Sequence, residues 1–140
     1  MTIKEKQQEV IEEFAAFDDW MDKYSLLIEL GNELDSFDEA NRLPQNLIDG
    51  CQSKVWLHAE LKNGLIEFQG DSDAIIVKGI VALLLRVLSG HSPDEILETE
   101  LFFIDEIGLK EHLSPTRSNG LVAMVKQIKA YALAFKVKMG

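Results

Sequence analysis

Residues 55–88 read VWLHAELKNGLIEFQGDSDAIIVKGIVALLLRVL, and this stretch decides the fold. Apolar side chains at positions 55, 57, 59 and 61 recur with period two, as in a half-buried strand. The pair Asn63-Gly64 predicts a type I′ hairpin turn, because both central positions of that turn require a positive φ. Residues 65–69 form the returning strand. The apolar run 74–88 then predicts a core helix, with N-caps offered by residues 70–73 and an end at Gly90.

The segment before this unit has helical spacing. Residues 3–17 place apolar side chains three, four and seven positions apart, which predicts an amphipathic helix. Asp18 or Asp19 caps a second helix, and Gly31 is its expected C-terminal stop. From residue 32 to residue 50 the period fades, so we expect an irregular loop there.

The segment after residue 90 is also helical. Ser92-Pro93-Asp94-Glu95 combines a capping box with proline at the first helical position. A last helix follows Pro115. The order of elements predicts an α+β fold, with helices packed on one side of a small antiparallel sheet, in a single domain over residues 1–140.

The charge balance limits the possible partners. The chain has 14 Lys+Arg against 24 Asp+Glu, a formal net charge of −10. Binding to nucleic acid or to an anionic membrane is disfavoured, because both need a basic face. Residues 1–40 hold 3 basic and 12 acidic side chains, whereas residues 117–140 hold 5 basic and no acidic ones. Such asymmetry fits either solvated helix faces or electrostatic steering toward a protein partner.

Three features indicate where the protein resides. The N-terminus reads as an amphipathic helix rather than a signal peptide, and the run 74–88 is shorter than the roughly 20 residues of a membrane span. The single cysteine, Cys51, excludes an intramolecular disulfide, a Cys-x-x-Cys pair and a multi-thiolate metal site. We therefore expect a protein of the reducing cytoplasm.

Cys51 is the first candidate for chemistry. It follows Gly50 at the end of a polar loop, where a second protein could approach, and Lys54 would favour its thiolate. The alternative is an inert buried cysteine, since free cysteine behaves as a small hydrophobe.

Other kinds of site have less support. His58, His91 and His112 have no spacing that places a base beside Cys51, so each is expected at the surface or in a hydrogen bond. Scattered histidines and one cysteine give no metal-binding pattern. Arg117 could bind an anion or pair with the acidic half of the chain, or simply lie exposed at the start of a helix.

Four segments together resemble one family. They are Glu29-Leu30-Gly31, Pro44-Gln45-Asn46 with Gly50-Cys51-Gln52-Ser53-Lys54-Val55-Trp56, Gly70-Asp71-Ser72-Asp73-Ala74 with Val77-Lys78-Gly79, and His112-Leu113-Ser114-Pro115-Thr116-Arg117 with Gly120-Leu121 and Ala123-Met124. In this order they resemble the SufE family of sulfur-acceptor proteins, which includes the CsdE proteins, and are closest to SufE.

The resemblance implies an α+β fold shared with iron–sulfur scaffold proteins and a role in iron–sulfur cluster assembly. It implies that Cys51 accepts sulfur as a persulfide from a SufS-type cysteine desulfurase, stimulates that enzyme and passes the sulfur to a Suf-type scaffold. The pyridoxal phosphate belongs to the desulfurase, so no cofactor or metal is expected on this chain, which does not itself cleave cysteine.

Three functions remain open from the sequence. A persulfide carrier needs Cys51, whereas a non-catalytic adaptor that regulates a desulfurase would tolerate its replacement. A stand-alone thiol enzyme lacks a base. For a carrier, we expect Cys51 to be shielded until docking, with the loop from Pro44 to Ser53 as the mobile piece and Gly50 as its hinge.

Overall fold

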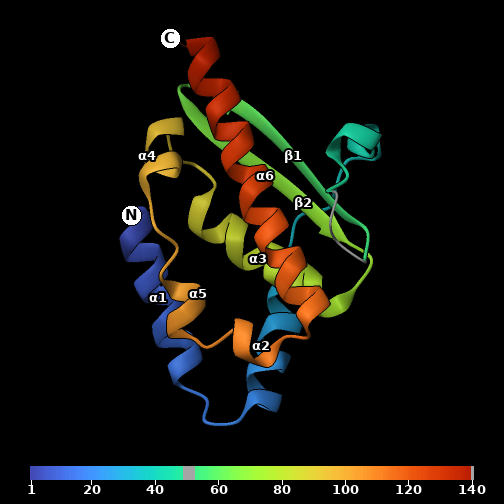
Figure 1. The fold of residues 1–140 in the computed structure, drawn as a ribbon, viewed down its shortest axis with the longest axis vertical. Coiled ribbons are helices and arrows are strands. Elements are labelled where there is room, and N and C mark those ends of the chain that lie inside the picture. Colours follow the sequence, from blue (N-terminus) through green and yellow to red (C-terminus); the bar gives the residue numbers. More distant parts are fainter. Residues whose placement is uncertain (49–52, 140) are drawn as a thin grey trace.

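The computed structural model describes residues 1–48 and 53–139. The elements are α1 (Ile3–Ala15), α2 (Trp20–Asn32), the 3₁₀ turns η1 (Glu39–Asn41) and η2 (Pro44–Asn46), β1 (Val55–Lys62), β2 (Leu65–Ser72), α3 (Ile75–Leu88), α4 (Pro93–Glu98), α5 (Phe103–Glu106), η3 (Lys110–His112) and α6 (Pro115–Met139). The long helix α6 runs across the front of the molecule beside the hairpin, with α3 behind it (Figure 1). The predicted α+β class is confirmed.

The hairpin forms as the sequence predicts. β1 and β2 pair antiparallel with Lys62 opposite Leu65, and Asn63 and Gly64 have φ values of 53° and 80°. Buried and exposed side chains alternate along β2, so one face of the hairpin packs against the helices. β2 continues to Ser72, three residues beyond the expected end at residue 69.

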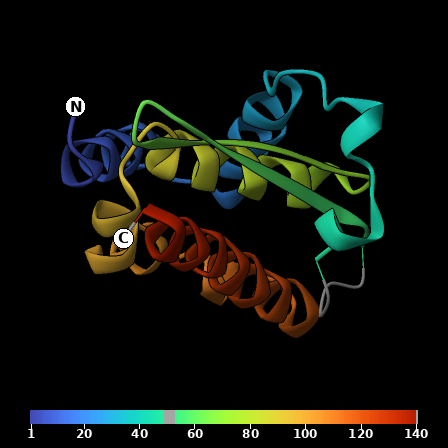
Figure 2. The same ribbon diagram turned by 90° about the horizontal axis from the view of Figure 1, so that it is seen from above.

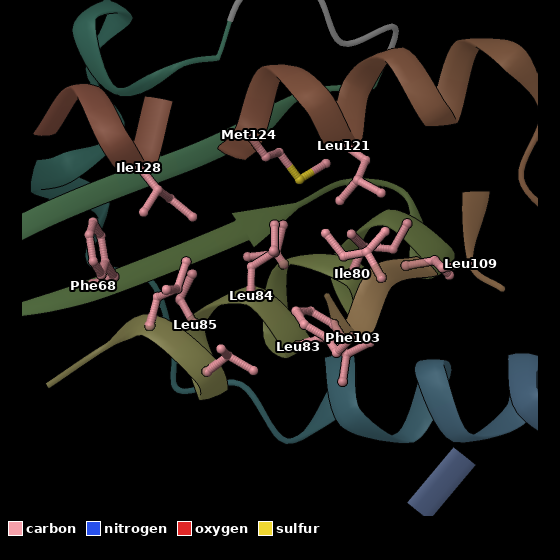
Figure 3. Packing of buried hydrophobic residues seen from close by; sticks show 14 of the residues in the cluster. Phe68, Ile80, Leu83, Leu84, Leu85, Phe103, Leu109, Leu121, Met124 and Ile128 are labelled. Atoms are coloured by element: carbon pink, nitrogen blue, oxygen red, sulfur yellow. The ribbon is translucent and has the colours of Figure 1, made fainter. Parts of the chain in front are cut away.

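Helix α3 is the centre of the core. Ten of its 14 residues are buried, and it contacts α1, α2, α6 and β2. Figure 2 shows α3 in the middle of the molecule, with α6 on one side of it. Leu121 and Met124 of α6 point toward Ile80 and Leu84 of α3 (Figure 3). Burial of this apolar face fixes α6 against the rest of the fold.

Gly31 and Gly79 meet where α2 crosses α3. A Cβ on Gly31 would lie 2.9 Å from the Gly79 nitrogen, and one on Gly79 would lie 2.3 Å from the Leu27 carbonyl oxygen. The predicted role of Gly31 as a helix stop is wrong, because α2 continues through it to Asn32. The glycine is needed for the close approach of two helices.

The predicted helix caps of α2 and α4 form as expected, whereas the cap of α3 does not. Asp19 caps α2, and Ser92 with Glu95 forms a complete capping box at α4. The α3 cap is different: its N-cap residue, Ala74, makes no side-chain cap bond. Of the predicted caps, Ser72 accepts a hydrogen bond from the Ala74 nitrogen, whereas Asp71 and Asp73 have partners outside the helix.

Candidate functional site

Three of the four segments quoted from the sequence line one cavity. Its volume is about 310 Å³, and its lining residues are Ser53, Val77, Ser114, Thr116, Arg117, Gly120 and Met124. Ser53 precedes β1, Val77 belongs to α3, and the others come from the start of α6 and the residue before it. The remaining segment, Glu29-Leu30-Gly31, lies at the crossing of α2 and α3 instead. Folding therefore brings together residues more than 60 positions apart in the chain.

Cys51, the predicted sulfur acceptor, lies outside the described residues, as do Gly50 and Gln52. Ser53, two positions after it in the sequence, lines the cavity. The chain on either side is anchored to the end of the hairpin. The Ile48 nitrogen donates to the Val55 oxygen at 2.9 Å, and the Lys54 nitrogen donates to Asp73 Oδ1 at 3.0 Å.

The cavity is polar and carries a cation. Arg117 is exposed, and no carboxylate pairs with its side chain among the residues that the structure describes. None of the lining residues named above is acidic. The Arg117 nitrogen donates to Ser114 Oγ at 3.3 Å, in the first turn of α6. A helix N-terminus and an arginine both favour a negative group, so the cavity suits a thiolate or another small anion.

Asp71, near the end of β2, is the centre of an ion-pair network with Arg42 and Lys78. Arg42 Nη2 lies 2.5 Å from Asp71 Oδ2, and Lys78 Nζ lies 3.5 Å from Asp71 Oδ1. Burial by itself would raise the pKa of Asp71, but hydrogen bonds from Arg42 and the Ser72 nitrogen, with the charge of Lys78, lower it overall. The Arg42 guanidinium also lies over the Trp56 ring, at 5.7 Å. Asp71 therefore ties the segment before Cys51 to the hairpin.

The three histidines lie in separate places, and none is among the cavity residues. His58 pairs with Glu60 at 3.2 Å on the exposed side of β1. His112 stacks on Trp20, with ring centroids 3.9 Å apart. His91, expected at the surface or in a hydrogen bond, is only 6% exposed; its Nδ1 lies 3.3 Å from Glu95, and its Nε2 has no partner in the described part of the chain.

The described residues contain neither a metal-binding cluster nor a helix that could span a membrane. No group of three or more histidine, cysteine or acidic side chains there is arranged to hold a metal ion. No helix in residues 1–48 or 53–139 is long and apolar enough to cross a membrane.

Two groups near the segment before Cys51 are not foreseen from the sequence. Arg42 is the only cation between residues 24 and 53, which could have marked it as a partner for a buried carboxylate. Tyr131 donates from its hydroxyl toward Asn46 Oδ1 at 3.0 Å and toward the Leu57 oxygen at 3.1 Å. No sequence pattern points to a contact between residues 85 positions apart.

Comparison with known proteins supports one family. The family model described as "SufE: Fe-S metabolism associated domain" matches residues 8–132. An uncharacterized SufE-like protein from Rhizobium etli is 44% identical over 129 residues, which cover 89% of this chain and 87% of that protein. Another, from Rhizobium meliloti (strain 1021), is 43% identical over 129 residues, covering 89% and 92%.

A solved structure supports the fold. The solution structure of a hypothetical protein from Thermus thermophilus matches with a TM-score of 0.76 and 24% identity, over 92% of this chain and 94% of the other.

Proposed function

Because this chain belongs to the SufE family, whose domain is associated with Fe–S metabolism, we propose that it is a sulfur carrier. In this proposal Cys51 accepts sulfur from a SufS-type cysteine desulfurase, and the protein delivers the sulfur to a Suf-type cluster scaffold. The observation that carries the proposal is the cavity next to Ser53, where Arg117 and the first turn of α6 face a site without acidic lining residues. Such surroundings favour a thiolate, which is the reactive form of cysteine.

The transfer resembles thiol–disulfide exchange. The Cys51 thiolate attacks the outer sulfur of the persulfide on the donor enzyme, and a new sulfur–sulfur bond forms on Cys51. The sulfur–sulfur bond of the donor breaks, and the donor cysteine leaves as a thiolate. No external oxidant or reductant is consumed, because one sulfur–sulfur bond replaces another. We propose that Cys51 reacts at this cavity, where Arg117 would stabilise the negative charge on the attacking thiolate and on the resulting persulfide.

The sequence suits a carrier in a second respect. Cys51 is the only cysteine, so no internal thiol can discharge the persulfide by forming a disulfide. The pyridoxal phosphate that releases sulfur from cysteine stays with the desulfurase. We propose a single domain, working in the cytoplasm without a cofactor of its own.

Intact-protein mass spectrometry tests this function. The protein is mixed with a cognate desulfurase, pyridoxal phosphate and cysteine, and we expect it to gain the mass of one or more sulfur atoms, reversibly with a reductant. Cys51→Ser should gain none and should abolish stimulation of the desulfurase. If wild type gains no sulfur but still binds the desulfurase, the protein is instead an adaptor that regulates that enzyme.

A further inference from the structure

The hydroxyl of Tyr131 faces two acceptors but has one hydrogen to donate. The Asn46 Oδ1 atom lies 3.0 Å away and the Leu57 oxygen 3.1 Å away. A tyrosine hydroxyl carries one proton, so it can donate fully to only one of them at a time. Tyrosine already keeps this proton at neutral pH, and burial raises the pKa of Tyr131 further, against a side-chain hydrogen bond with Gln127 that lowers it. The two acceptors belong to different parts of the fold: Asn46 ends η2, and Leu57 lies in β1.

Residues 39–48, which we call the arm, lead into Cys51. In Figures 1 and 2 the arm, in teal, lies at the side of the molecule. A hollow of about 640 Å³ separates its last residues from α6, with Leu47 on one wall and Val122 on the other. Within the described part of the chain, Tyr131 to Asn46 is the only hydrogen bond or ion pair that joins the arm to α6. The arm therefore has few contacts on this side and space beside it.

On the α6 side, movement of Asn46 would leave the Tyr131 hydroxyl paired, while Arg42 with Asp71 and the Ile48 nitrogen with the Val55 oxygen hold the arm to the hairpin. If Asn46 moves away, the Tyr131 hydroxyl still has the Leu57 oxygen as an acceptor, and the Asn46 amide gains water. A buried donor that loses its only partner destabilises a protein by about 1–3 kcal/mol. The second acceptor removes that cost, so release loses the bond to Asn46 without leaving the tyrosine hydroxyl unpaired.

We propose that Tyr131 is a positioning residue for the arm that leads into Cys51: its hydroxyl holds the arm through Asn46 and passes to the Leu57 oxygen when the arm moves. The inference rests on the proposed function and on the expectation from the sequence that Cys51 is shielded in the free protein and presented on docking. It adds a residue that holds the arm on the α6 side.

Tyr131→Phe tests the proposal, because it removes the hydroxyl and keeps the ring. Amide hydrogen exchange over residues 41–48, and alkylation of Cys51 by iodoacetamide, should both become about two- to tenfold faster, the range for loss of one ordinary hydrogen bond. The protein concentration that gives half-maximal desulfurase stimulation should fall by a similar factor with the maximal rate unchanged, because a larger fraction is competent to dock. Damage to the fold would not lower this concentration.

Two further variants make the test specific. Lys129→Met removes the bond from Lys129 Nζ to the Thr99 oxygen, a side-chain bond from the same helix to a different segment, and should leave all three readouts unchanged. Asn46→Ala should reproduce the faster exchange and alkylation, and adding Tyr131→Phe to it should accelerate them no further.

The proposal is wrong if Tyr131→Phe exchanges and alkylates at the wild-type rate, or if its effect multiplies with that of Asn46→Ala. Exchange and alkylation need no desulfurase. A protein that takes up no sulfur therefore refutes the proposed function, and these two rates still decide the role of Tyr131.

Discussion

The crossing of α2 and α3 should not tolerate a single added methyl group. In Gly79→Ala the new Cβ would lie 2.3 Å from the Leu27 oxygen and 2.7 Å from the Leu27 carbonyl carbon. Both are backbone atoms, so no side-chain rotation can relieve the contact. An ordinary contact needs about 3.4 Å or more, and the helices must therefore move apart by about 1 Å.

Two opposite effects set how much Gly79→Ala lowers the free energy of unfolding. Alanine is favoured over glycine inside a helix by about 1 kcal/mol. Overpacking a well-packed interior costs about 1–3 kcal/mol and sometimes more. Because the added Cβ lies on α3, the most buried helix of the fold, and clashes with the backbone of α2, we place the cost at the upper end of this range. The expected net loss in the free energy of unfolding is about 2 kcal/mol.

Urea unfolding followed by circular dichroism measures this loss. Gly79→Ser should lose more than Gly79→Ala, because its side chain is larger. Gly31→Ala should also destabilise the protein, and the double variant should lose less than the sum, because one displacement of α2 relieves both contacts. If Gly79→Ala is as stable as wild type, or gains the roughly 1 kcal/mol expected from helix propensity alone, the close crossing is not as described.

Three more outcomes are expected. Arg117 is an exposed cation at the cavity, and we expect it also to help dock the desulfurase. Arg117→Glu should then raise the concentration needed for half-maximal desulfurase stimulation several-fold at low salt, an effect that added salt weakens. Lys4→Glu, the same charge change on α1, should not, and equal effects of the two variants would count against this role of Arg117. Asp71→Asn should lower the free energy of unfolding by about 1–2 kcal/mol at pH 7. Since the folded pKa of Asp71 lies below its ordinary value of 3.8, this contribution is present above about pH 4 and is lost as the pH falls through the lowered pKa, so wild type and variant should converge in acid. Ser92→Ala, which removes the capping box of α4, should cost about 1 kcal/mol in the same measurement, and no loss would show that the box adds nothing.

Local signals in the sequence are enough for the hairpin and for two caps. The turn at Asn63-Gly64 depends only on the φ values of those residues, and the capping box at Ser92 depends on residues three positions apart. Gly31 resembles a helix stop in the sequence because its actual role lies in contact with Gly79, 48 positions away. The end of β2 is misplaced from the sequence for a similar reason: Asp71 is polar, but its ion pair with Arg42 keeps it in the strand.

The site can be predicted only in outline. Cys51 and Arg117 are candidate residues from the sequence, but spacing alone does not place Ser53 and Arg117 around one cavity. The two residues line the same cavity because α6 packs on α3 through Leu121 and Met124. The hydrogen bond between Tyr131 and Asn46 is harder still to foresee, because the tyrosine belongs to no recognisable motif and its helix has no unusual local pattern.

A sheet of two strands has two open edges, and each is a template on which another copy could add a strand. Here both have partners. At the edge of β1, the Ile48 nitrogen donates to the Val55 oxygen and the Tyr131 hydroxyl donates to the Leu57 oxygen. At the edge of β2, the Ile66 nitrogen donates to the His91 oxygen, and the Ile66 oxygen accepts from the Gly90 nitrogen. At the edge of β1, the arm therefore occupies a position where another strand could add. Release of the arm would uncover the Val55 oxygen at this edge, so a chain that held the arm too loosely would expose an edge strand.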